Sequence, residues 1–315
     1  MELALIISIA FILDVFFGDF WGKVHPICLI GNMITFLQRQ SNKVFHIFKS
    51  PTIEIVIGGI IAFITILLTT YISLLLASFH LVFELLIINS AIAYKGLIVH
   101  LQKVYLPLKQ GDITRARQAL SQIVGRDVDN LNKSEITRGG VETGAESISD
   151  GIIAPLFYAV IGGAPLVMTY KAVNTLDSMI GYPFEPYKNI GYVSAKLDDL
   201  LNFIPARMTT LFMLVAGWVL NLNVRLGYLY FRKDANKHPS PNAGCSEATI
   251  SGLLNVRLGG TNTYQGQPSF RTYLHKDGNL PKVEDISSTI NIIKITSWIG
   301  LIVFICLRVY LRWLF

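Results

Sequence analysis

Residues 141–151, Val-Glu-Thr-Gly-Ala-Glu-Ser-Ile-Ser-Asp-Gly, run directly into an apolar stretch at 152–170. Acidic side chains recur at every fourth position, as Glu142, Glu146 and Asp150. Residues four apart lie on one face of a helix, so this spacing predicts a row of three carboxylates. Such a row at a membrane edge is suited to a metal or phosphate site.

The composition is that of a membrane protein. Of the 315 residues, 52% are hydrophobic and only 15% are charged, whereas soluble domains carry about 25% charged residues. Roughly 20 apolar residues span a bilayer, and the predominantly apolar segments are 3–17, 52–79, 81–101, 152–170, 204–222 and 287–307. We therefore predict an all-α, polytopic helical membrane protein, with residues 1–315 forming a single integral membrane domain.

Two of these segments differ from simple spans. Residues 3–17 are short and carry Asp14 near their end. A carboxylate at the bilayer centre costs at least about 2.5 kcal/mol, so Asp14 either has a function or reaches the interface. Residues 152–170 predict a broken or re-entrant element, because proline and glycine interrupt the helix. The interrupting residues are Pro155, Gly162, Gly163 and Pro165.

The net charge of +6 does not indicate a nucleic-acid surface, because acidic residues nearly match the basic ones in the long loops. Basic residues follow the first and the last apolar segments, which the positive-inside bias places in the cytoplasm. They are Lys23, Arg39, Lys43, Lys49, Arg308 and Arg312. The N-terminus lacks the pattern of a cleaved signal, so we expect it to be retained and to lie outside. The cysteines show no CxxC spacing and indicate neither a zinc site nor disulfides.

Polar residues are collected in blocks at 18–51, 102–150, 171–203 and 223–286. We expect the chemistry to lie in these blocks, which together form the predicted active site. Their patterns predict four helices. The first runs from an Asp112 cap to Gly125, and the second begins at Ser134 and has a surface of small residues. The other two cover residues 189–201 and 246–256.

Further polar residues flank the interrupted apolar stretch, namely Asn174, Asp177, Asp198, Asp199 and Arg207. Such a cluster could hold Mg²⁺ through one or two carboxylates, while phosphate oxygens and water complete its shell. The alternative is a solvated helix face, since Arg138 lies four residues before Glu142. An exposed pair of this kind contributes only about 0.3–0.5 kcal/mol.

Other motifs also have two interpretations. Arg126 and Asp127 form either a site or an ion pair that closes a turn. Arg207 begins an apolar segment, where its guanidinium could bind an anionic ligand or a lipid headgroup. Residues 238–244, His-Pro-Ser-Pro-Asn-Ala-Gly, could present backbone N–H groups to phosphate at the following helix, although such clusters are mostly turns. The sequence contains no P-loop, Rossmann fingerprint or nucleophile elbow.

A series of short motifs covers nearly the whole chain in order. They are Asp14-x-x-x-Gly18-Asp19, His25-Pro26, Gly125-Arg126-Asp127, Val141-Glu142 with Ala145-Glu146, Ser149-Asp150-Gly151, Asn174-Thr175-Leu176-Asp177-Ser178-Met179, Leu197-Asp198-Asp199, Pro205-Ala206-Arg207 and Ser240-Pro241-Asn242-Ala243-Gly244. In number, order and spacing these motifs resemble the adenosylcobinamide-phosphate synthase family of cobalamin biosynthesis. The chain departs from that family at Phe20, where proline is common, and at Ser147, where asparagine is common.

The resemblance implies a membrane ligase that joins a propionate carboxylate of adenosylcobyric acid to the amine of an aminopropanol phosphate, with ATP consumed. Because an ionised carboxylate resists amine attack, ATP most simply converts it to an acyl phosphate, which requires Mg²⁺ and cationic side chains. The expected metal ligands are Glu142, Glu146, Asp150 and Asp177. The expected substrate- and phosphate-binding residues are Arg126, Asp127, Asn174, Arg207, Asn242, Gly244 and Tyr264, with Gly259 and Gly260 also lining the cavity. The expected catalytic residues are Asp19, His25, Asp198 and Asp199, of which Asp19, His25 or Asp198 deprotonates the amine.

The expected partners are the corrinoid, the aminopropanol phosphate and the lipid bilayer, with other cobalamin-pathway enzymes as further candidates and no nucleic acid. The active-site loops are expected in the cytoplasm. Two other classes stay open, a secondary transporter with a broken-helix site and a non-catalytic membrane scaffold for corrinoids. If residues 204–222 and 287–307 both cross, the loop at 223–286 lies opposite the other polar blocks. We therefore hypothesise that one apolar element does not cross or packs as a hairpin.

Overall fold

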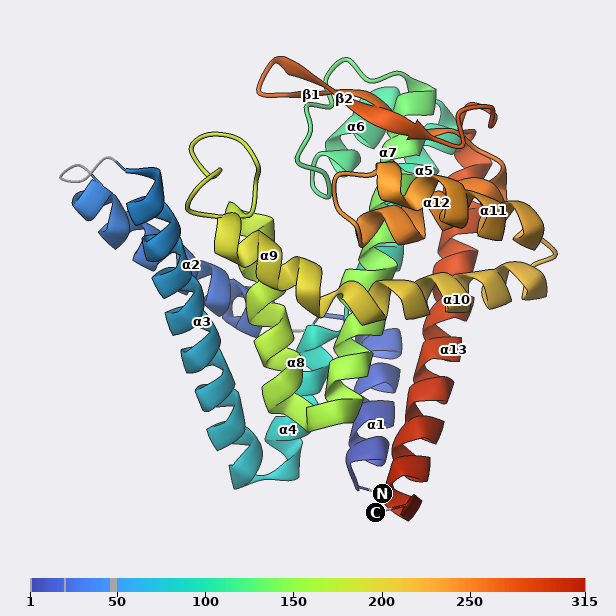
Figure 1. The fold of residues 1–315 in the computed structure, drawn as a ribbon. Helices are drawn as coiled ribbons and strands as arrows, with labels where there is room; N and C mark the ends of the chain where they lie inside the picture. Colours follow the sequence, from blue (N-terminus) through green and yellow to red (C-terminus); the bar gives the residue numbers. More distant parts are fainter. Residues whose placement is uncertain (1, 20, 46–49, 315) are drawn as a thin grey trace. The chain divides into compact units, whose positions relative to one another are not determined.

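The computed structural model describes residues 2–19, 21–45 and 50–314, and Figure 1 shows their fold. The helices are α1 (Glu2–Phe17), α2 (Pro26–Phe45), α3 (Pro51–Phe79), α4 (Leu81–Ala91), α5 (Tyr94–Gln110), α6 (Ile113–Leu120), α7 (Lys133–Ile148), α8 (Ala154–Ile180), α9 (Tyr192–Leu201), α10 (Phe203–Val219), α11 (Val224–Asp234), α12 (Ala243–Leu254) and α13 (Val283–Leu314). Short helical turns are η1 (Gly22–Val24), η2 (Ser149–Ile153) and η3 (Ala235–Lys237), and the strands are β1 (Leu258–Tyr264) and β2 (Gln267–Leu274).

Within the described residues, four helical runs are long and apolar enough to cross a membrane, and α9 with α10 would make a fifth if they form one span. The four runs are Pro51–Phe79, Leu81–Gln110, Lys133–Ile180 and Val283–Tyr310. The chain is therefore a polytopic helical membrane protein, as its composition predicted. α1 has 16 residues, fewer than the roughly 20 that a span needs. Its Asp14 is buried inside the protein, with 3% of its surface exposed.

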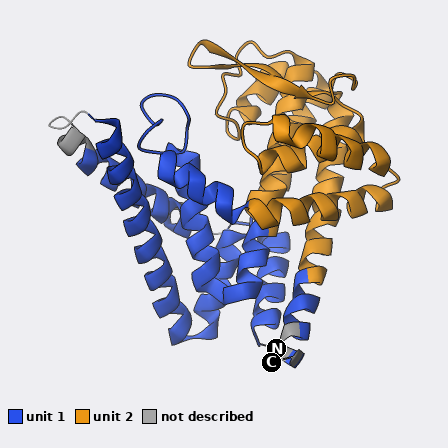
Figure 2. Cartoon of the chain, viewed as in Figure 1, with its two compact units in different colours: residues 1–93, 154–202, 304–315 blue, residues 94–153, 203–303 orange. Residues whose placement is uncertain are grey.

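The chain divides into two compact units (Figure 2). The first unit comprises residues 1–93, 154–202 and 304–315, and the second comprises residues 94–153 and 203–303. Apart from Phe203, the polar blocks 18–51 and 171–203 belong to the first unit, and the blocks 102–150 and 223–286 belong to the second. The single membrane domain proposed from the sequence stays a prediction.

In the first unit, α8 is a helical hairpin rather than a straight helix (Figure 1). Its backbone leaves the helical region at Gly162 and Gly163. The rings of Tyr158 and Tyr170 stack with centroids 5.0 Å apart, although a continuous helix would separate these positions by about 18 Å. The break predicted for residues 152–170 is therefore confirmed, and the two halves of α8 fold back on each other.

Glycine is required at the turn of this hairpin. Gly163 has φ 63° and ψ −154°, a conformation that is essentially restricted to glycine. A Cβ atom at this position would also lie 2.4 Å from Oε1 of Glu84 in α4. Pro165 lies two residues later and has no N–H to donate to a helix. Local sequence and packing therefore both fix the turn between the two halves.

In the second unit, α7 packs closely through the small-residue surface that the sequence predicted. A Cβ atom on Gly144 would lie 2.7 Å from the Thr289 methyl group and 3.1 Å from Leu101. The helix begins at Lys133, one residue before the predicted Ser134. Its Asn132 and Glu135 form a reciprocal capping box that satisfies two backbone N–H groups.

The other helices predicted in polar blocks are present with shifted ends. Asp112 caps α6 by accepting a hydrogen bond from the Arg115 N–H group. This helix ends at Leu120 rather than at the predicted Gly125, because the Ile123 and Val124 N–H groups both return to the Leu120 carbonyl in a turn. The helices predicted at 189–201 and 246–256 are α9 and α12.

One small sheet was not expected from the sequence. β1 and β2 pair antiparallel, with Thr261 opposite Phe270 and Tyr264 opposite Gln267. Gln265 and Gly266 form the connecting turn and have φ values of 51° and 78°, as a type I′ turn requires. Residues 258–266 are therefore a strand and the hairpin turn that follows it.

Candidate functional site

A buried charge network in the second unit joins α7 to the β-hairpin. Glu142 Oε2 accepts a hydrogen bond of 2.5 Å from Nη2 of Arg126. Its Oε1 accepts from the Gly259 N–H at 2.9 Å and lies 3.8 Å from Nε of Arg138. The side chains of Arg126 and Glu142 are only 7% and 6% exposed. One carboxylate is therefore shared by two guanidinium groups, and the three residues carry a net positive charge.

Both arginines are held to the first strand of the hairpin. Arg138 donates to the carbonyls of Gly259 and Thr261, and both guanidinium groups donate to Oδ1 of Asn262. This geometry differs from the solvated helix face considered from the sequence, because the Arg138–Glu142 pair is buried. It also uses Glu142 as a structural acceptor, which leaves less of its capacity for a metal ion.

Glu247 and His238 form a second group of buried ionisable side chains in this unit. Oε1 of Glu247 lies 3.4 Å from Nε2 of His238, and both side chains are less than a tenth exposed. Burial, followed by the charges of Glu142 and Glu146, raises the pKa of Glu247 well above its usual range. Burial and Arg271 lower the pKa of His238 to about 4. Both directions favour the uncharged forms, so Glu247 can donate a proton within this group.

Arg271 of β2 borders the same group. Its guanidinium donates to the Tyr264 hydroxyl at 3.2 Å and lies 3.4 Å from Nε2 of His238. Burial acts to lower the pKa of Arg271, but Tyr264 and the carboxylates of Glu247, Glu142 and Glu146 outweigh it and raise that pKa. The predicted residues Glu142, Glu146 and Tyr264 are thus close enough to share one electrostatic environment.

Asp127 and Gly244 have clear structural roles. The carboxylate of Asp127 accepts hydrogen bonds from the Gln265 and Gly266 N–H groups and so holds the hairpin turn. A Cβ atom on Gly244 would lie 2.2 Å from the Ala235 carbonyl oxygen, so only glycine fits there. These contacts account for both residues without a ligand, and their predicted part in substrate binding stays a prediction.

Arg207 and Asn242 lie close together, as a shared site requires. Nη1 of Arg207 is 3.4 Å from Oδ1 of Asn242. The guanidinium also donates to the Phe203 carbonyl and covers the Phe203 ring at 3.5 Å. The loop at 238–244 leads into α12, whose N-cap Asn242 makes no side-chain capping bond.

The first unit contains a separate polar cluster around Asp198 of α9. Its Oδ1 accepts from Nδ2 of Asn174 at 3.3 Å, and its Oδ2 accepts from Nδ2 of Asn202 at 3.0 Å. The Tyr170 hydroxyl donates to Asn202 at 3.1 Å, and Lys171 donates to Asn174 at 3.2 Å. Asn174 and Asp198, which were predicted to share a site, are therefore in direct contact.

His25 and Asp19 lie at the start of α2. Nε2 of His25 is 3.9 Å from Oδ1 of Asp19. Burial lowers the pKa of His25, Asp19 raises it, and Lys171 lowers it further. Nδ1 of His25 accepts the Ile27 N–H, so the proton of the neutral ring is on Nε2. In this tautomer the Nε2–H group faces Asp19, and the lone pair of Nδ1 is used by the Ile27 N–H.

Of the four predicted metal ligands, Glu142, Glu146 and Asp150 belong to the second unit and Asp177 to the first, and a site that all four share stays a prediction. Among the residues that the structure describes, no group of three His, Cys, Asp or Glu side chains is placed to hold a metal ion. Glu142 is paired with arginines, Glu146 is exposed, and Asp177 belongs to the first unit and lies against Gly181. One or two carboxylates completed by phosphate oxygens remain the ligand set that fits Mg²⁺.

Asp199 lies 3.7 Å from the Lys196 ammonium in an exposed i,i+3 pair. Ser147, one of the two departures noted in the sequence, is half-buried in α7, and Phe20 lies outside the described residues. Asp150 lies in η2, directly before α8.

Several charged residues of these clusters were not assigned from the sequence, namely Arg138 as a buried residue, Lys171, His238, Glu247 and Arg271. Glu247 gave one available signal, since it is the only ionisable residue besides Cys245 in Ala243–Leu254. A lone carboxylate within a helix of small and apolar residues is costly to bury and indicates a function. Arg271 gave none, because the hairpin that positions it was not predicted.

Comparison with known proteins identifies the family. The family model described as CobD/Cbib protein matches residues 7–293. The chain belongs to the CobD/Cbib family. CobD/Cbib relatives include "Cobalamin biosynthesis protein CobD" of Clostridium perfringens, 39% identical over 97% of this chain and 98% of the relative. The protein of the same name from Halalkalibacterium halodurans is 41% identical over 95% and 94%. "Cobalamin biosynthesis protein CbiB" of Salmonella paratyphi B is 38% identical over 95% and 96%. No solved structure matches this CobD/Cbib chain.

Proposed function

We propose that the protein acts in cobalamin biosynthesis as an ATP-dependent ligase. It joins a propionate carboxylate of adenosylcobyric acid to the amine of (R)-1-aminopropan-2-yl phosphate and forms adenosylcobinamide phosphate. The observation that carries this proposal is the match over nearly the whole chain to relatives named for cobalamin biosynthesis. The motifs that resemble adenosylcobinamide-phosphate synthases specify the reaction.

The buried charges of the second unit support the activation step. An acyl phosphate forms when a carboxylate oxygen attacks the γ-phosphorus of ATP and ADP leaves. The charge on the transferring phosphoryl group must be offset by cations in a site of low dielectric constant. Arg126 and Arg138 share the Glu142 carboxylate, whose charge also acts on Arg271. This excess of guanidinium groups suits polyanionic substrates.

The predicted carboxylates would bind Mg²⁺ together with the phosphate oxygens of the nucleotide, rather than as a complete ligand set of their own. Glu146 and Asp150 would hold it, because Glu142 is committed to its arginines. The ion would supply charge neutralisation for the phosphate groups. Arg271 and the neutral Glu247 would orient the phosphate oxygens by donating hydrogen bonds.

Asp198 is the best candidate for the base that deprotonates the amine. Its two oxygens each accept one amide hydrogen bond and so retain lone pairs for a proton. The Asn174 and Asn202 amides fix the carboxylate, and a positioned base of this kind contributes about 10²–10⁴-fold to the rate. The amine then attacks the acyl carbon, the amide bond forms, and inorganic phosphate leaves.

We also place the active-site loops in the cytoplasm. Lys23 and Arg39 follow the apolar residues of α1, and the positive-inside bias favours the cytoplasm for such basic residues. A cysteine introduced at Asn242 should be labelled by a membrane-impermeant maleimide only after the cells are opened. Labelling in intact cells would contradict this orientation.

Product analysis with purified protein tests the proposed reaction. The detergent-solubilised chain should form the amide from adenosylcobyric acid and aminopropanol phosphate when Mg-ATP is present, and not when nucleotide is omitted. A failure to form product under conditions in which the protein is folded would contradict the ligase. Unchanged product formation in cells in which Glu146 or Asp177 is replaced by Ala would indicate a scaffold instead.

One feature favours a transporter as the second candidate. The hairpin break at Gly162 and Gly163 places non-helical backbone beside the Glu84 carboxylate inside apolar helices. Secondary transporters place their sites at such discontinuous helices. Uptake of radiolabelled corrinoid into proteoliposomes, driven by an ion gradient and without product formation, would support this function.

A further inference from the structure

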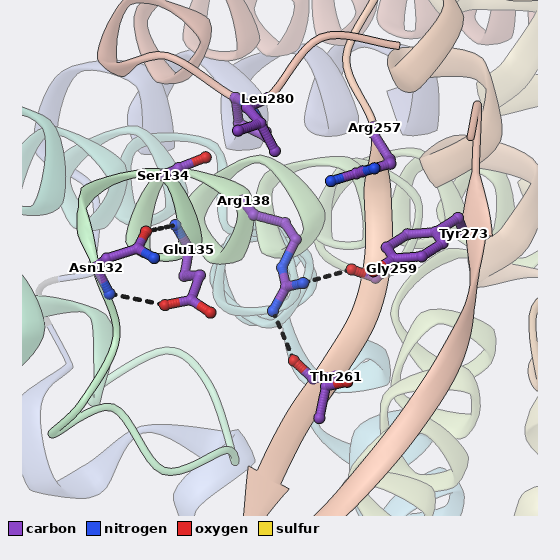
Figure 3. Close-up of a pocket in the computed structure, with 10 residues that line it drawn as sticks. Asn132, Ser134, Glu135, Arg138, Arg257, Gly259, Thr261, Tyr273 and Leu280 are labelled. Atoms are coloured by element: carbon purple, nitrogen blue, oxygen red, sulfur yellow. Dashed lines mark hydrogen bonds between the residues drawn. The ribbon is translucent and has the colours of Figure 1, made fainter. Parts of the chain in front are cut away.

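A cavity of about 270 Å³ lies in the second unit, and of its lining residues only Gly259 was assigned to the site from the sequence. Figure 3 shows it between the start of α7 and the two hairpin strands. Its charged side chains come from Glu135, Arg138 and Arg257, and uncharged polar side chains come from Asn132, Ser134 and Thr261. Leu280 and Pro281 form an apolar part of its wall. The cavity therefore combines charge of both signs with a small apolar surface.

Arg257 is the cation that this cavity leaves available. Its guanidinium stacks on the Tyr273 ring at 4.7 Å, and Figure 3 shows its end directed into the cavity. It makes no ion pair with any residue in the described parts of the chain. Stacking on an aromatic ring fixes the plane of a guanidinium and keeps its N–H groups free for an anion. This geometry is suited to a phosphate group.

Arg138 forms the inner wall and adds positive charge. Its side chain is nine-tenths buried and is fixed by the Gly259 and Thr261 carbonyls. Its Nε has no hydrogen-bond partner among the described residues and lies 3.8 Å from Glu142. Because Glu142 is also paired with Arg126, it compensates only part of the charge on Arg138. The inner end of the cavity is therefore electropositive.

Glu135 provides the opposite charge at the edge of the cavity. One of its oxygens, Oε2, accepts the Asn132 N–H in the capping box of α7. Its carboxylate makes no ion pair with a described residue. Figure 3 shows the carboxylate across from Arg257, with Arg138 between them. A ligand with an anionic and a cationic end would match both groups.

We propose that this cavity binds a zwitterionic aminoalkyl phosphate. Its phosphate lies against Arg257 and Arg138, its ammonium lies against Glu135, and its short carbon chain contacts Leu280. The volume favours a small ligand, since drug-sized molecules occupy pockets of roughly 300–1,000 Å³. Under the proposed function, on which this assignment of the natural ligand rests, the occupant is the aminoalcohol phosphate that supplies the amine.

Direct binding to the detergent-solubilised full chain tests the proposal. The probes are O-phosphoethanolamine, inorganic phosphate and ATP, and the dissociation constants come from isothermal titration calorimetry. Arg257→Gln should weaken binding of O-phosphoethanolamine and of inorganic phosphate by about tenfold, because it removes a charge-assisted phosphate contact. Arg257→Lys should retain part of the affinity. Arg225→Gln, on the exposed face of α11, is the matched control and should bind as the wild type does.

Glu135→Gln separates an aminoalkyl phosphate from other phosphates. Glutamine keeps the capping box, so α7 should still form. This variant should weaken O-phosphoethanolamine several-fold and leave inorganic phosphate unchanged. Equal effects on the two probes would show that Glu135 does not recognise the ammonium and would overturn the proposal. Displacement of O-phosphoethanolamine by ATP at a lower concentration would assign the cavity to the nucleotide and would also overturn it.

The binding data and the product assay distinguish a failure of the cavity assignment from a failure of the proposed ligase. If the wild type forms product but Arg257→Gln changes neither binding nor KM for the aminoalcohol phosphate, the cavity assignment is wrong and the ligase stands. If O-phosphoethanolamine binds in a manner that depends on Arg257 and Glu135 but no amide forms, the cavity assignment stands and the ligase is wrong. If no probe binds to the wild type, the cavity proposal is wrong.

Discussion

Replacing Glu142 with glutamine should destabilise the protein, because it removes the carboxylate that two buried arginines share. The substitution preserves side-chain size but takes the negative charge away from Arg126 and Arg138. It also puts an amide group near the Gly259 N–H, which now donates to Glu142 Oε1 at 2.9 Å. Arg138 keeps its hydrogen bonds to the strand carbonyls, whereas the guanidinium of Arg126 keeps its bond to Asn262.

The magnitude follows from the burial of the pair. Removing one partner of a buried ion pair costs about 3–5 kcal/mol. An unfolding entropy of about 2.1 cal/mol/K per residue, applied to 315 residues, converts this cost to a decrease in Tm of about 5–8 °C. A Glu142→Gln,Arg126→Met double variant should recover part of the loss, because it removes the uncompensated charge as well.

Thermal unfolding of the detergent-solubilised protein, followed by circular dichroism, measures this effect. Asp129→Asn is the control, because Asp129 is exposed in the same unit and should change Tm by less than about 1 °C. Equal Tm values for Glu142→Gln and the control would refute the buried network. A higher Tm in Glu142→Gln would do so as well.

Three further outcomes are expected. Gly163→Ala should lower Tm by several degrees, because a positive φ and the Glu84 contact cost about 1–3 kcal/mol. Gly96→Ala is the control and should leave Tm unchanged, because the space around Gly96 is open. Equal decreases in Tm for the two variants would contradict the hairpin turn. Asp198→Asn should reduce kcat for amide formation by about 10²-fold or more, and an unchanged kcat would exclude Asp198 as the base. This variant should also lower Tm, because its new NH2 group faces one of the two amides that donate to the carboxylate. The Tm of Glu247→Gln minus the Tm of the wild type should increase as the pH rises from 5 to 8.

The sign of the pH effect follows from the raised pKa of Glu247. Burial and the neighbouring carboxylates raise the pKa of Glu247 in the folded state above the ordinary value of 4.5. The folded protein therefore binds more protons than the unfolded chain above pH 4.5, and this contribution to stability declines as the pH rises. Glutamine does not titrate, so the stability of Glu247→Gln does not contain this pH-dependent loss. The Tm of Glu247→Gln should therefore rise relative to the Tm of the wild type as the pH increases. A difference in Tm that does not depend on pH would contradict the buried neutral carboxyl group.

The helices were predictable because their signals are local. Apolar segments at 52–79 and 287–307 appear within α3 and α13. Paired glycines followed by Pro165 predicted the break in α8, since glycine and proline act on the backbone at their own positions. The fold-back itself follows from packing, through the stacked rings of Tyr158 and Tyr170.

The hairpin could not be predicted, because its stability depends on residues remote in the sequence. Strand β1 begins Leu-Gly-Gly, which has little strand propensity. Arg138 holds it through backbone carbonyls, and Asp127 holds its turn through two N–H groups. Arg138 and Asp127 lie outside the hairpin in the sequence, so the residue pattern of the hairpin itself does not indicate them.

The sequence predicted several of the residues in the two polar clusters, but few of the contacts between them. The spacing of Glu142 and Glu146 correctly placed acidic side chains on α7, and Asn174 and Asp198 are in contact as expected. The partner of Glu142 was not predictable, because Arg126 reaches it from the loop after α6. Glu247 and Arg271 enter the same environment only through the tertiary fold.

Isotope transfer during the reaction tests the proposed ligase most directly. Adenosylcobyric acid labelled with ¹⁸O in the reacting carboxylate is incubated with aminopropanol phosphate, Mg-ATP and the purified chain. Attack of that carboxylate on ATP predicts one ¹⁸O atom in the inorganic phosphate for each amide formed, measured by mass spectrometry. Amide formation without nucleotide, or product accompanied by unlabelled phosphate, would contradict activation of the carboxylate as an acyl phosphate.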